Sequence, residues 1–537
     1  MKAAKHLLSR LKQSQLAFYT IILMLLNGKV WGQEESNYES SWESLHQHSC
    51  PEWFKDAKFG IFMHWGVMSV VKENDGWYGR HMYMKTGGEW GNDYYDHLKN
   101  YGHPSEFGYK DLIPKWKAEN WNPEALVAFY KDIGAKYIVP VAVHHDNFDL
   151  YDSSFQPWNS VNMGPKRDVI GEWKKAAGKY GLRFGVSSHS DRAWSWLNPS
   201  HGHDTEGAYK GMPYDGNLTL DDGKGTWWEG CDPADLYTRP HKEDEAPDKD
   251  YCDTWYKRTI DLTDKYQPDL IYFDGPLPMV CSGKACSEAR EWTKNYGLSF
   301  AAHYYNENRK RNKGTNEAII AIKEWGPGSV PDTKPVVLDI EKGGADKILE
   351  YPWQTDTSLS GTWFWNGSGY SEISDTIVIH NMCDVVSKNG NYLLNVGLTA
   401  DGVLPDHEKR TLENIGEWLK INGEAIYETR PWIQFGEGRT KVETGHFKQN
   451  KEPYTSKDIR FTTKGDVLYA IFMGWPDSGK VIVESVAKGS VLYSQKIESV
   501  GLLGYDGKLS WKQTPKGLVV KLPKRRPGNY AYTLKIK

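Results

Sequence analysis

Eight short apolar segments recur between residues 59 and 397, and helix-like stretches separate several of them. Continuous apolar runs of this length are typical of strands buried on both faces, as in a parallel sheet. Their alternation with helices predicts an α/β fold, specifically a (β/α)8-like TIM barrel. The segments are FGIFMHW from Phe59, YIVPVAV from Tyr137, RFGVSS from Arg183, DLIYFDG from Asp269, EAIIAI from Glu317, VVLDIE from Val336, TWFW from Thr362 and NYLLNVG from Asn391.

Three of the intervening stretches have a clear helical pattern, namely NPEALVAFYKDIGA, IGEWKKAAGKYG and CDTWYKRTIDLTDKYQ. Pro268 follows the last of them and is a stop signal before the next apolar run. One connection is much longer than the others, because residues 190–250 are rich in Gly, Asp, Trp and Pro. Long loops of this kind are often functional, and in a barrel this one would form a wall of the active face.

The pattern changes after Trp432, where the helical periodicity stops. Segments such as DIRFTTKGDVLYAIFMGW, KVIVESV and YAYTLKIK alternate at strand period and have turn residues between them. This pattern predicts a β-sandwich of about 100 residues. We therefore expect a catalytic barrel at residues 33–432 and a β-sandwich domain at residues 433–537.

The first 32 residues have the features of an export signal. A basic stretch without acids precedes the mostly apolar run LAFYTIILMLL, and Val30 and Gly32 stand at −3 and −1 of a cleavage before Gln33. The run is shorter than the roughly 20 residues of a membrane span, although an uncleaved anchor stays open. The sequence thus predicts an exported protein, periplasmic or secreted, that has no membrane segment once the signal is removed.

The composition narrows the class of partner. The 66 basic and 70 acidic residues nearly balance, giving a formal net charge of −4, and no concentrated basic patch predicts nucleic-acid binding. The chain has 24 Trp and 32 Tyr. Many of these aromatics must serve the core, but Trp also offers the flat apolar face that packs against a sugar ring. Formation of a homo-oligomer is left open.

Six cysteines are compatible with an oxidising compartment. Cys281 and Cys286 are close enough along the chain to pair, and Cys231 with Cys252 could close a loop. Neither pair has the C-x-x-C spacing of a zinc site.

Polar and aromatic residues follow the predicted strands at the ends where barrel enzymes collect their functional groups. His64 ends the first run, His144, His145 and Asp146 follow the second, His189 follows the third, Asp274 ends the fourth and Glu341 ends the sixth, while Trp363 and Trp365 lie at the seventh. These side chains are therefore expected to converge on one rim.

Two carboxylates from different strands suggest acid-assisted cleavage of an acetal, with one as nucleophile and the other as proton donor. Asp274 sits at a strand end and suits a nucleophile, whereas Glu341 has a longer reach and suits a proton donor. The alternatives are a turn-forming Asp-Gly at Asp274 and a solvated loop acid at Glu341. Asp339 competes with Glu341 for the donor role.

The histidines could instead bind a metal, as in barrel amidohydrolases. Those enzymes usually have His-x-His on the first strand, whereas this run reads Met63-His64-Trp65. His144 and His145 are adjacent and would point to opposite sides of a strand, which hinders shared ligation. We therefore predict no metal and no cofactor, and expect the imidazoles to bind hydroxyl groups.

Several segments in order resemble the α-L-fucosidases of glycoside hydrolase family 29, over residues 53–432. They are WFKDAKFGIFMHWG, HHDNFDLYDS with WNSVNMGPKRD, LRFGVSSHSDRAW, LIYFDG, YPWQTDTSLSGTWFW, and DVVSKNGNYLLNVGLTADG followed by NGEAIYETRPW. The resemblance implies a barrel followed by a β-sandwich, and a retaining exo-acting hydrolase without a metal. Its substrate would be a terminal α-L-fucosyl residue on a glycan.

The resemblance also implies roles for individual residues. Asp274 matches the nucleophile and Glu341 is the nearest match to the acid/base. The residues matched to sugar binding are His64, Trp77, His144, His145 and His189, with Phe364 or Trp365 against the fucose methyl group. Residues 190–250 would then bind the part of the glycan beyond the cleaved bond.

Three residues depart from the family pattern. Asn147 stands where the family has Gly, Gly76 stands where many members have an acid, and Lys323 stands where some have Arg. These changes put the hydroxyl contacts, and so the sugar, in question. An α-L-galactosidase, a catalytically inactive carbohydrate-binding protein and a metal hydrolase are the alternatives.

Overall fold

The computed structural model describes residues 37–72, 76–85, 92–242, 245–277, 285–323, 333–367 and 373–537, with only the backbone at 285–292 and 294. The export signal predicted at residues 1–32 lies outside these ranges and stays a prediction. Of the helices within them, none combines the length and the apolar character needed to cross a membrane.

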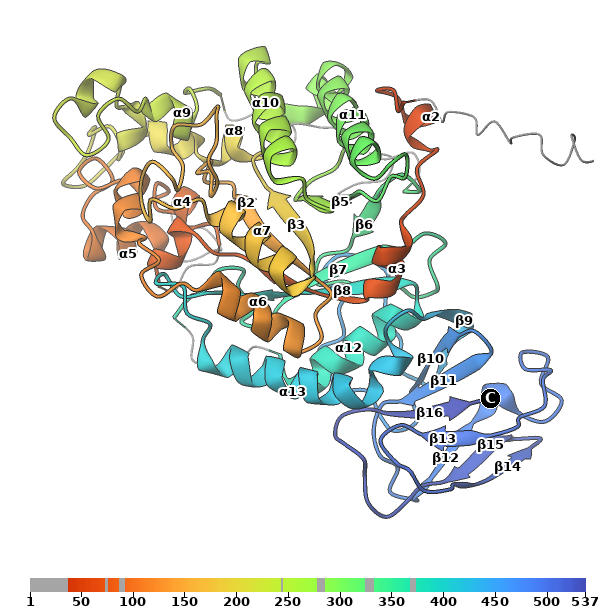
Figure 1. Ribbon diagram of the computed structural model, residues 1–537. Helices are drawn as coiled ribbons and strands as arrows, with labels where there is room; N and C mark the ends of the chain where they lie inside the picture. The colour runs from red at the N-terminus through yellow and green to blue at the C-terminus, as the bar shows by residue number, and fades with distance from the viewer. Residues whose placement is uncertain are drawn as a thin grey trace, which may run out of the picture. The chain divides into compact units, whose positions relative to one another are not determined.

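Eight parallel strands pair in sequence order and the last pairs with the first, which closes a barrel (Figure 1). Seven of the eight apolar runs overlap one of these strands, so the predicted (β/α)8-like barrel is confirmed. The strands are β1 (Phe59–Met63), β2 (Tyr137–Val143), β3 (Arg183–Ser188), β4 (Leu270–Phe273), β5 (Ile319–Lys323), β6 (Val337–Asp339), β7 (Trp353–Ser358) and β8 (Gly390–Val396).

The predicted seventh strand at residues 362–365 is wrong, because β7 lies earlier and TWFW belongs to the loop that follows it. All six residues of β7 are buried, although five of them are polar. Their polar groups find partners inside the barrel: the Tyr137 hydroxyl donates to Gln354 Oε1 at 2.9 Å, and the Tyr272 hydroxyl donates to Asp356 Oδ2 at 3.0 Å. A search for apolar runs passes over a strand of this kind.

Barrel side chains form a buried cluster with α3 (Glu52–Ala57), which precedes β1 in the chain. Phe54 and Ala57 of this helix pack with Phe62, Tyr137 and Leu393. Gly60 on β1 lies directly beside the Tyr137 ring, since a Cβ there would come within 2.4 Å of a ring carbon. Only glycine allows this close approach.

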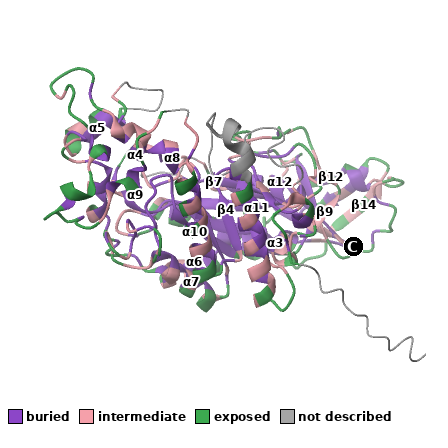
Figure 2. Cartoon of the chain, turned by 90° about the horizontal axis from the view of Figure 1, so that it is seen from above, coloured by how far each residue is buried: buried purple, intermediate pink, exposed green. Residues whose placement is uncertain are grey.

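Helices surround the strands, and Figure 2 shows buried strands at the centre with exposed outer helix faces. Several helices begin at Asn or Asp, whose side chains accept hydrogen bonds from the first backbone N–H groups of the helix. Asn122 accepts from the Ala125 N–H, Asp168 from Gly171 and Asp248 from Tyr251. The α-helices are α2 (Trp42–Leu45), α3, α4 (Tyr78–His81), α5 (Asp93–Asn100), α6 (Pro123–Asp132), α7 (Val169–Tyr180), α8 (Ala193–Trp196), α9 (Pro233–Tyr237), α10 (Lys249–Tyr266), α11 (Ala285–Arg311), α12 (Asp375–Ser387) and α13 (Asp406–Asn422).

Short 3-10 helices occupy several connections, and three of them lie in the long segment 190–250 with α8 and α9. This segment is therefore largely folded. The 3-10 helices are η1 (Val67–Val70), η2 (Tyr109–Lys115), η3 (Asn198–His201), η4 (Asp215–Asn217), η5 (Leu220–Gly223), η6 (Gly423–Ala425) and η7 (Glu484–Val486).

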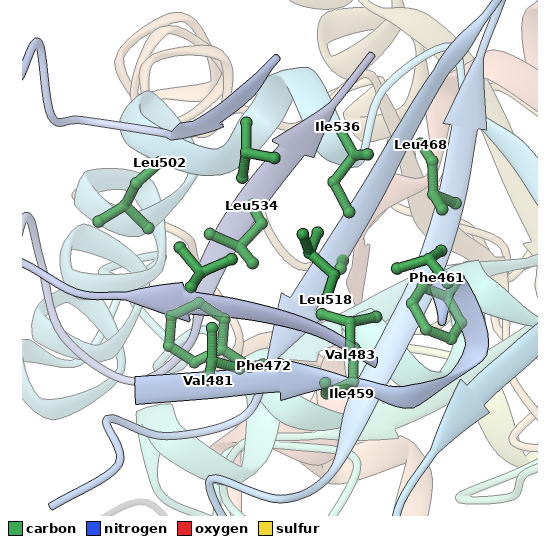
Figure 3. Close-up of a cluster of buried hydrophobic side chains, with 14 of the residues drawn as sticks. Ile459, Phe461, Leu468, Phe472, Val481, Val483, Leu502, Leu518, Leu534 and Ile536 are labelled. Atoms are coloured by element: carbon green, nitrogen blue, oxygen red, sulfur yellow. The ribbon is translucent and has the colours of Figure 1, made fainter. Parts of the chain in front are cut away.

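Two antiparallel sheets follow the barrel, in the orders β13-β16-β11-β10-β9 and β12-β15-β14. Side chains from both sheets share one apolar core, including Phe461, Phe472, Val483, Leu518 and Leu534 (Figure 3). The predicted sandwich is therefore confirmed. Its strands are β9 (Arg430–Glu437), β10 (Ile459–Lys464), β11 (Val467–Phe472), β12 (Lys480–Val483), β13 (Val500–Leu502), β14 (Ser510–Thr514), β15 (Gly517–Lys521) and β16 (Tyr532–Ile536).

The barrel and the sheets meet at a buried ionic cluster. Arg460 of β10 donates through Nε to Asp384 of α12 at 2.5 Å, and Lys388 reaches the other carboxylate oxygen at 2.7 Å. The predicted domain boundary after Trp432 falls within β9.

The structure decides one of the two cysteine pairings that the sequence left open. Cys231 and Cys252 are both free thiols, so these two residues do not form a disulfide. Cys281 lies outside the described residues, and so the pairing of Cys281 with Cys286 stays a prediction.

Candidate active site

A cavity of about 670 Å³ opens at the carboxyl ends of the barrel strands. It brings together His64, His144, His145, His189, Asp274, Glu341 and Trp77, which the sequence places far apart. Its other lining residues are Gly76, Arg80, His81, Met84, Arg192, Tyr272, Lys323, Lys342, Asp356, Gly361, Thr362, Trp363 and Phe447. The predicted rim of polar and aromatic groups is therefore present.

Four histidines, which we call the histidine side, follow β1, β2 and β3. His64 Nδ1 donates to the amide oxygen of Asn395 at 2.8 Å, and His145 Nδ1 donates to the His189 carbonyl at 3.0 Å. Because Nδ1 of the neutral His64 ring carries hydrogen, its Nε2 is an acceptor. His145 Nε2 instead lies 3.4 Å from Asp274 Oδ2. His144 Nδ1 is buried and has no hydrogen-bond partner within the part of the chain that the structure describes.

Burial keeps the histidine side uncharged. It lowers the pKa of His64 to about 4, and it places the pKa of His144 and of His189 well below the ordinary histidine value. At neutral pH these rings are therefore neutral groups that can donate and accept hydrogen bonds, as sugar hydroxyls require.

The expectation that His144 and His145 point to opposite sides of a strand is wrong. β2 ends at Val143, and both histidines belong to the turn that follows, where their ring centroids are 4.4 Å apart. The Asn147 N–H closes this turn by donating to the His144 carbonyl at 3.2 Å. Both rings can therefore line one cavity.

The backbone conformation of Asn147 explains why asparagine can stand where the family pattern has glycine. Its φ is +63°, a left-handed conformation in which Gly and Asn are the usual residues. Its side-chain amide donates to the carbonyls of Asp235 and Leu236 in the segment 190–250. The asparagine thus supports that segment and does not line the cavity. Asp146, beside it, is buried and accepts from the Tyr109 hydroxyl at 2.5 Å.

A second group of lining residues, which we call the carboxylate side, consists of Asp274, Lys323, Glu341 and Asp356, which lie on or just after β4 to β7. Asp274 joins the two groups, because its Oδ2 lies 3.4 Å from His145 Nε2 and 3.8 Å from His189 Nδ1. Lys323 Nζ lies 2.9 Å from Asp274 Oδ1 and 2.8 Å from Glu341 Oε2. Those two oxygens can therefore be no farther apart than about 5.7 Å, the sum of the two distances. The two candidate catalytic acids, separated along the chain, meet at one ammonium group.

The surroundings of Asp274 and Glu341 shift the pKa values of the two carboxyl groups in opposite directions. Burial alone would raise the pKa of Asp274, but Lys323 and then Arg192 outweigh it and hold this pKa well below its usual range. Burial raises the pKa of Glu341, and Asp356 and Asp274 add to this effect while Lys323 opposes it. One ionised and one more readily protonated carboxyl is the arrangement that a nucleophile and a proton donor need.

Asp339, the competitor for the donor role, is not among the cavity-lining residues. It is fully buried, and one of its oxygens accepts from Gln354 Nε2 at 2.8 Å. Burial and then Asp356 raise its pKa well above the usual value. Its position disfavours it as the donor.

The aromatic residues lie partly as expected. Trp77 lines the cavity beside His145, with ring centroids 5.7 Å apart. Phe364 is buried behind the histidine side, 4.9 Å from the His144 ring, and Trp363 lines the cavity instead. Trp365 is not among the lining residues.

The lining also includes residues that the sequence reasoning missed as site residues. Arg192 comes three positions after His189, and its closeness to the end of β3 could have identified it as a site residue. Asp356 was hidden by the misplaced seventh strand, and Phe447 comes from beyond the barrel strands, where no sequence signal pointed to it. Of the described residues in the segment 190–250, only Arg192 lines the cavity, and none of its tryptophans does.

The histidine side contains groups that could hold a metal. Ligand atoms of His64, His144 and His189 lie within 4.8 Å of one another, as do those of His145, His189 and Asp274. Lys323 disfavours a dication at the second group, because its own charge lies 2.9 Å from Asp274. The prediction of no metal stays a prediction.

A barrel whose strand ends present paired acids, neutral hydrogen-bonding rings and tryptophans defines a class of enzyme, the glycoside hydrolases. Comparison with family models narrows this class. The model for Alpha-L-fucosidase matches residues 25–424, and that for the Alpha-L-fucosidase C-terminal domain matches residues 449–537. The chain belongs to the alpha-L-fucosidase family, glycoside hydrolase family 29.

Characterised relatives support the same placement. The chain is 28% identical to the tissue alpha-L-fucosidase of Rattus norvegicus over 97% of this chain and 96% of the relative. It is 28% identical to that of Homo sapiens over 94% and 92%. The Thermotoga maritima alpha-fucosidase, solved in complex with fucose, is 27% identical with a TM-score of 0.65, over 93% of this chain and all of the other.

Proposed function

We propose that this enzyme removes terminal α-L-fucosyl residues from glycans by double displacement with retention of configuration. The Asp274 carboxylate attacks the anomeric carbon while Glu341 protonates the departing oxygen. Glu341 then takes a proton from water, which attacks the same carbon and frees Asp274.

The spacing of the two acids carries this proposal. Their nearest oxygens are within about 5.7 Å, because both contact Lys323 Nζ. Carboxyl groups about 5–5.5 Å apart are typical of retaining glycosidases, and inverting enzymes need about 6.5–9.5 Å to admit water. The low pKa of Asp274 and the raised pKa of Glu341 agree with these roles.

The histidine side is proposed to bind the fucose hydroxyls. His64 offers an Nε2 acceptor, and the buried Nδ1 of His144 is available for a hydrogen bond to a hydroxyl. His145 lies beside both this group and Asp274, with its Nε2 3.4 Å from Asp274 Oδ2. Trp77 and Trp363 offer apolar surface to the ring and its methyl group. The fucose bound to the Thermotoga maritima relative supports this sugar.

The released anomer tests the mechanism. Proton NMR during hydrolysis of an aryl α-L-fucoside should show α-L-fucose first, with the β-anomer arising later by mutarotation. Initial release of β-L-fucose would mean inversion and would remove Asp274 as nucleophile.

An α-L-galactosidase is the second candidate, and one observation favours keeping it. Gly76, in place of the family acid, lines the cavity and leaves side-chain space beside Trp363 and Phe364. L-galactose differs from L-fucose by a hydroxyl at C6. Rates on matched aryl fucoside and L-galactoside decide between them, and binding of either sugar without turnover would instead indicate an inactive carbohydrate-binding protein.

We also propose that the protein is exported, on the residue pattern of positions 1–32. Amino-terminal sequencing of the protein from its native host should begin at Gln33. A chain that begins at Met1 and stays in the membrane fraction would instead indicate an uncleaved anchor.

A further inference from the structure

A short segment after β9, residues 444–449, runs along the chain that follows β6. Phe447 N–H donates to the Glu341 carbonyl at 2.8 Å, and Gln449 N–H donates to the Lys342 carbonyl at 2.8 Å. Gly344 and Gly445 form a bridge, in which Gly445 N–H donates to Gly344 at 3.2 Å. Residues 444–448 lie between the regions matched by the two family models, which end at 424 and begin at 449.

The segment holds the backbone of Glu341 from both sides. The Glu341 N–H donates to His446 Nδ1 at 2.9 Å, while its carbonyl accepts from Phe447. Hydrogen bonds to the backbone of Glu341, the candidate proton donor, therefore also fix the positions of residues 446 and 447.

Phe447 is exposed over 59% of its surface and lines the cavity that holds Asp274 and Glu341. Its φ is +59°, which is rare and costly for a bulky residue. The hydrogen bonds on either side of Phe447 keep the backbone in this conformation. An aromatic side chain whose backbone is already held at the cavity wall offers a contact surface that needs little rearrangement.

We infer that Phe447 forms a subsite for the leaving group, a pyranose that presents a C–H face to the ring. This inference rests on the proposed function, because the leaving oxygen is the one that Glu341 protonates and the leaving sugar must lie on that side. The tryptophans of the segment 190–250, which the sequence suggested for this task, do not line the cavity.

Three substrates separate stacking from protonation. Fucosyl fluoride and 4-nitrophenyl α-L-fucoside both have activated leaving groups that need little protonation, but only the second offers a ring. An α-L-fucosyl disaccharide offers a ring and also needs protonation. Phe447→Ala should lower kcat/KM about tenfold for the nitrophenyl substrate and the disaccharide, and change it less than about twofold for the fluoride.

Matched variants support the reading of that experiment. Phe447→Trp keeps a flat ring and should therefore retain the preference for the nitrophenyl substrate over the fluoride that Phe447→Ala loses. Ile433→Ala removes another exposed side chain, 65% exposed on β9 and outside the cavity lining, and should change none of the three rates. An equal change on fluoride and nitrophenyl substrates, or a loss confined to the disaccharide, would overturn the subsite.

A binding measurement keeps the test independent of turnover. In the Asp274→Asn background, calorimetry should show that Phe447→Ala weakens disaccharide binding about tenfold and leaves fucose binding unchanged. Unchanged disaccharide binding would overturn the subsite while leaving the proposed hydrolysis intact. If the unsubstituted enzyme hydrolysed none of the three substrates, the proposed function itself would be wrong.

Discussion

The histidine side and the carboxylate side line one cavity and meet where Asp274 contacts His145 and His189, but the two groups differ in charge. Burial lowers the pKa of His64, His144 and His189, and these rings stay neutral. On the carboxylate side burial acts equally, yet Lys323 compensates it and keeps Asp274 ionised. Burial without a strong opposite charge leaves the histidines neutral and able to hydrogen-bond. Burial beside the Lys323 ammonium leaves the Asp274 carboxylate charged.

Removing the nucleophile should have the largest effect. Asp274→Asn keeps the shape of the side chain but cannot form the glycosyl-enzyme, so kcat/KM on an aryl α-L-fucoside should fall on the order of 10⁴-fold. Fucose binding, measured by calorimetry, should persist. Asp264→Asn, a surface change, serves as control, and near-normal turnover of Asp274→Asn would place the nucleophile elsewhere.

The proton donor should show its role through the leaving group. Glu341→Gln should lower kcat/KM on the order of 10³-fold for an α-L-fucosyl disaccharide and less than about tenfold for an aryl fucoside. Exposed Glu350→Gln is the matched control. Equal losses on both substrates would indicate that another group donates the proton.

Lys323 is what distinguishes the carboxylate side, so its removal tests the comparison directly. Its charge lowers the pKa of both Asp274 and Glu341, and Lys323→Met should therefore raise both. The proposed mechanism needs Asp274 ionised and Glu341 protonated, so both limbs of the kcat/KM pH profile should move to higher pH.

At neutral pH we expect the Lys323→Met rate to fall about 100-fold, since a preorganised charge beside the reacting carboxylate is lost. Lys323→Arg keeps the charge and should keep the limbs in place. Limbs that do not move in Lys323→Met would mean that burial and the remaining neighbours alone set these pKa values.

A change on the histidine side should be smaller and independent of pH. His144→Phe removes neutral hydrogen bonds, which should weaken fucose binding about tenfold. Because the ring is neutral, the ratio of the two affinities should be constant between pH 6 and pH 8. A ratio that varies with pH would show that His144 carries a charge; His303→Gln at the surface is the control.

Metal removal should have the least effect. Dialysis against a strong chelator should change kcat/KM less than about twofold if the histidine side binds hydroxyls. Loss of activity that added Zn²⁺ restores would assign the neighbouring ligand atoms of His64, His144 and His189 to an ion.

The sequence predicted the fold well because most barrel strands carry the apolar runs that burial on both faces requires. It failed at β7, where Gln354, Thr355 and Asp356 are buried but polar and have hydrogen-bond partners on or just after other strands. Local patterns do not contain such partners. The apolar TWFW that follows therefore matches the pattern of a buried strand better than β7 does.

The candidate site was predicted to a similar extent and for similar reasons. His64, His144, His189 and Asp274 stand where strands end, a position that the sequence reveals. The bridging role of Lys323 and the position of Phe447 depend on which segments meet in space. The pairing of Glu341 with His446 links residues 105 positions apart, and no periodicity reports it.

The bonds between Glu341 and residues 446 and 447 mean that the reactive centre is not confined to one module. A barrel without residues 444–449 would lose the hydrogen bonds that hold the Glu341 backbone. It would also lose Phe447 from the cavity lining. If Phe447 forms the inferred subsite, exchanging the carboxy-terminal module would change both the choice of leaving group and the stability of the barrel.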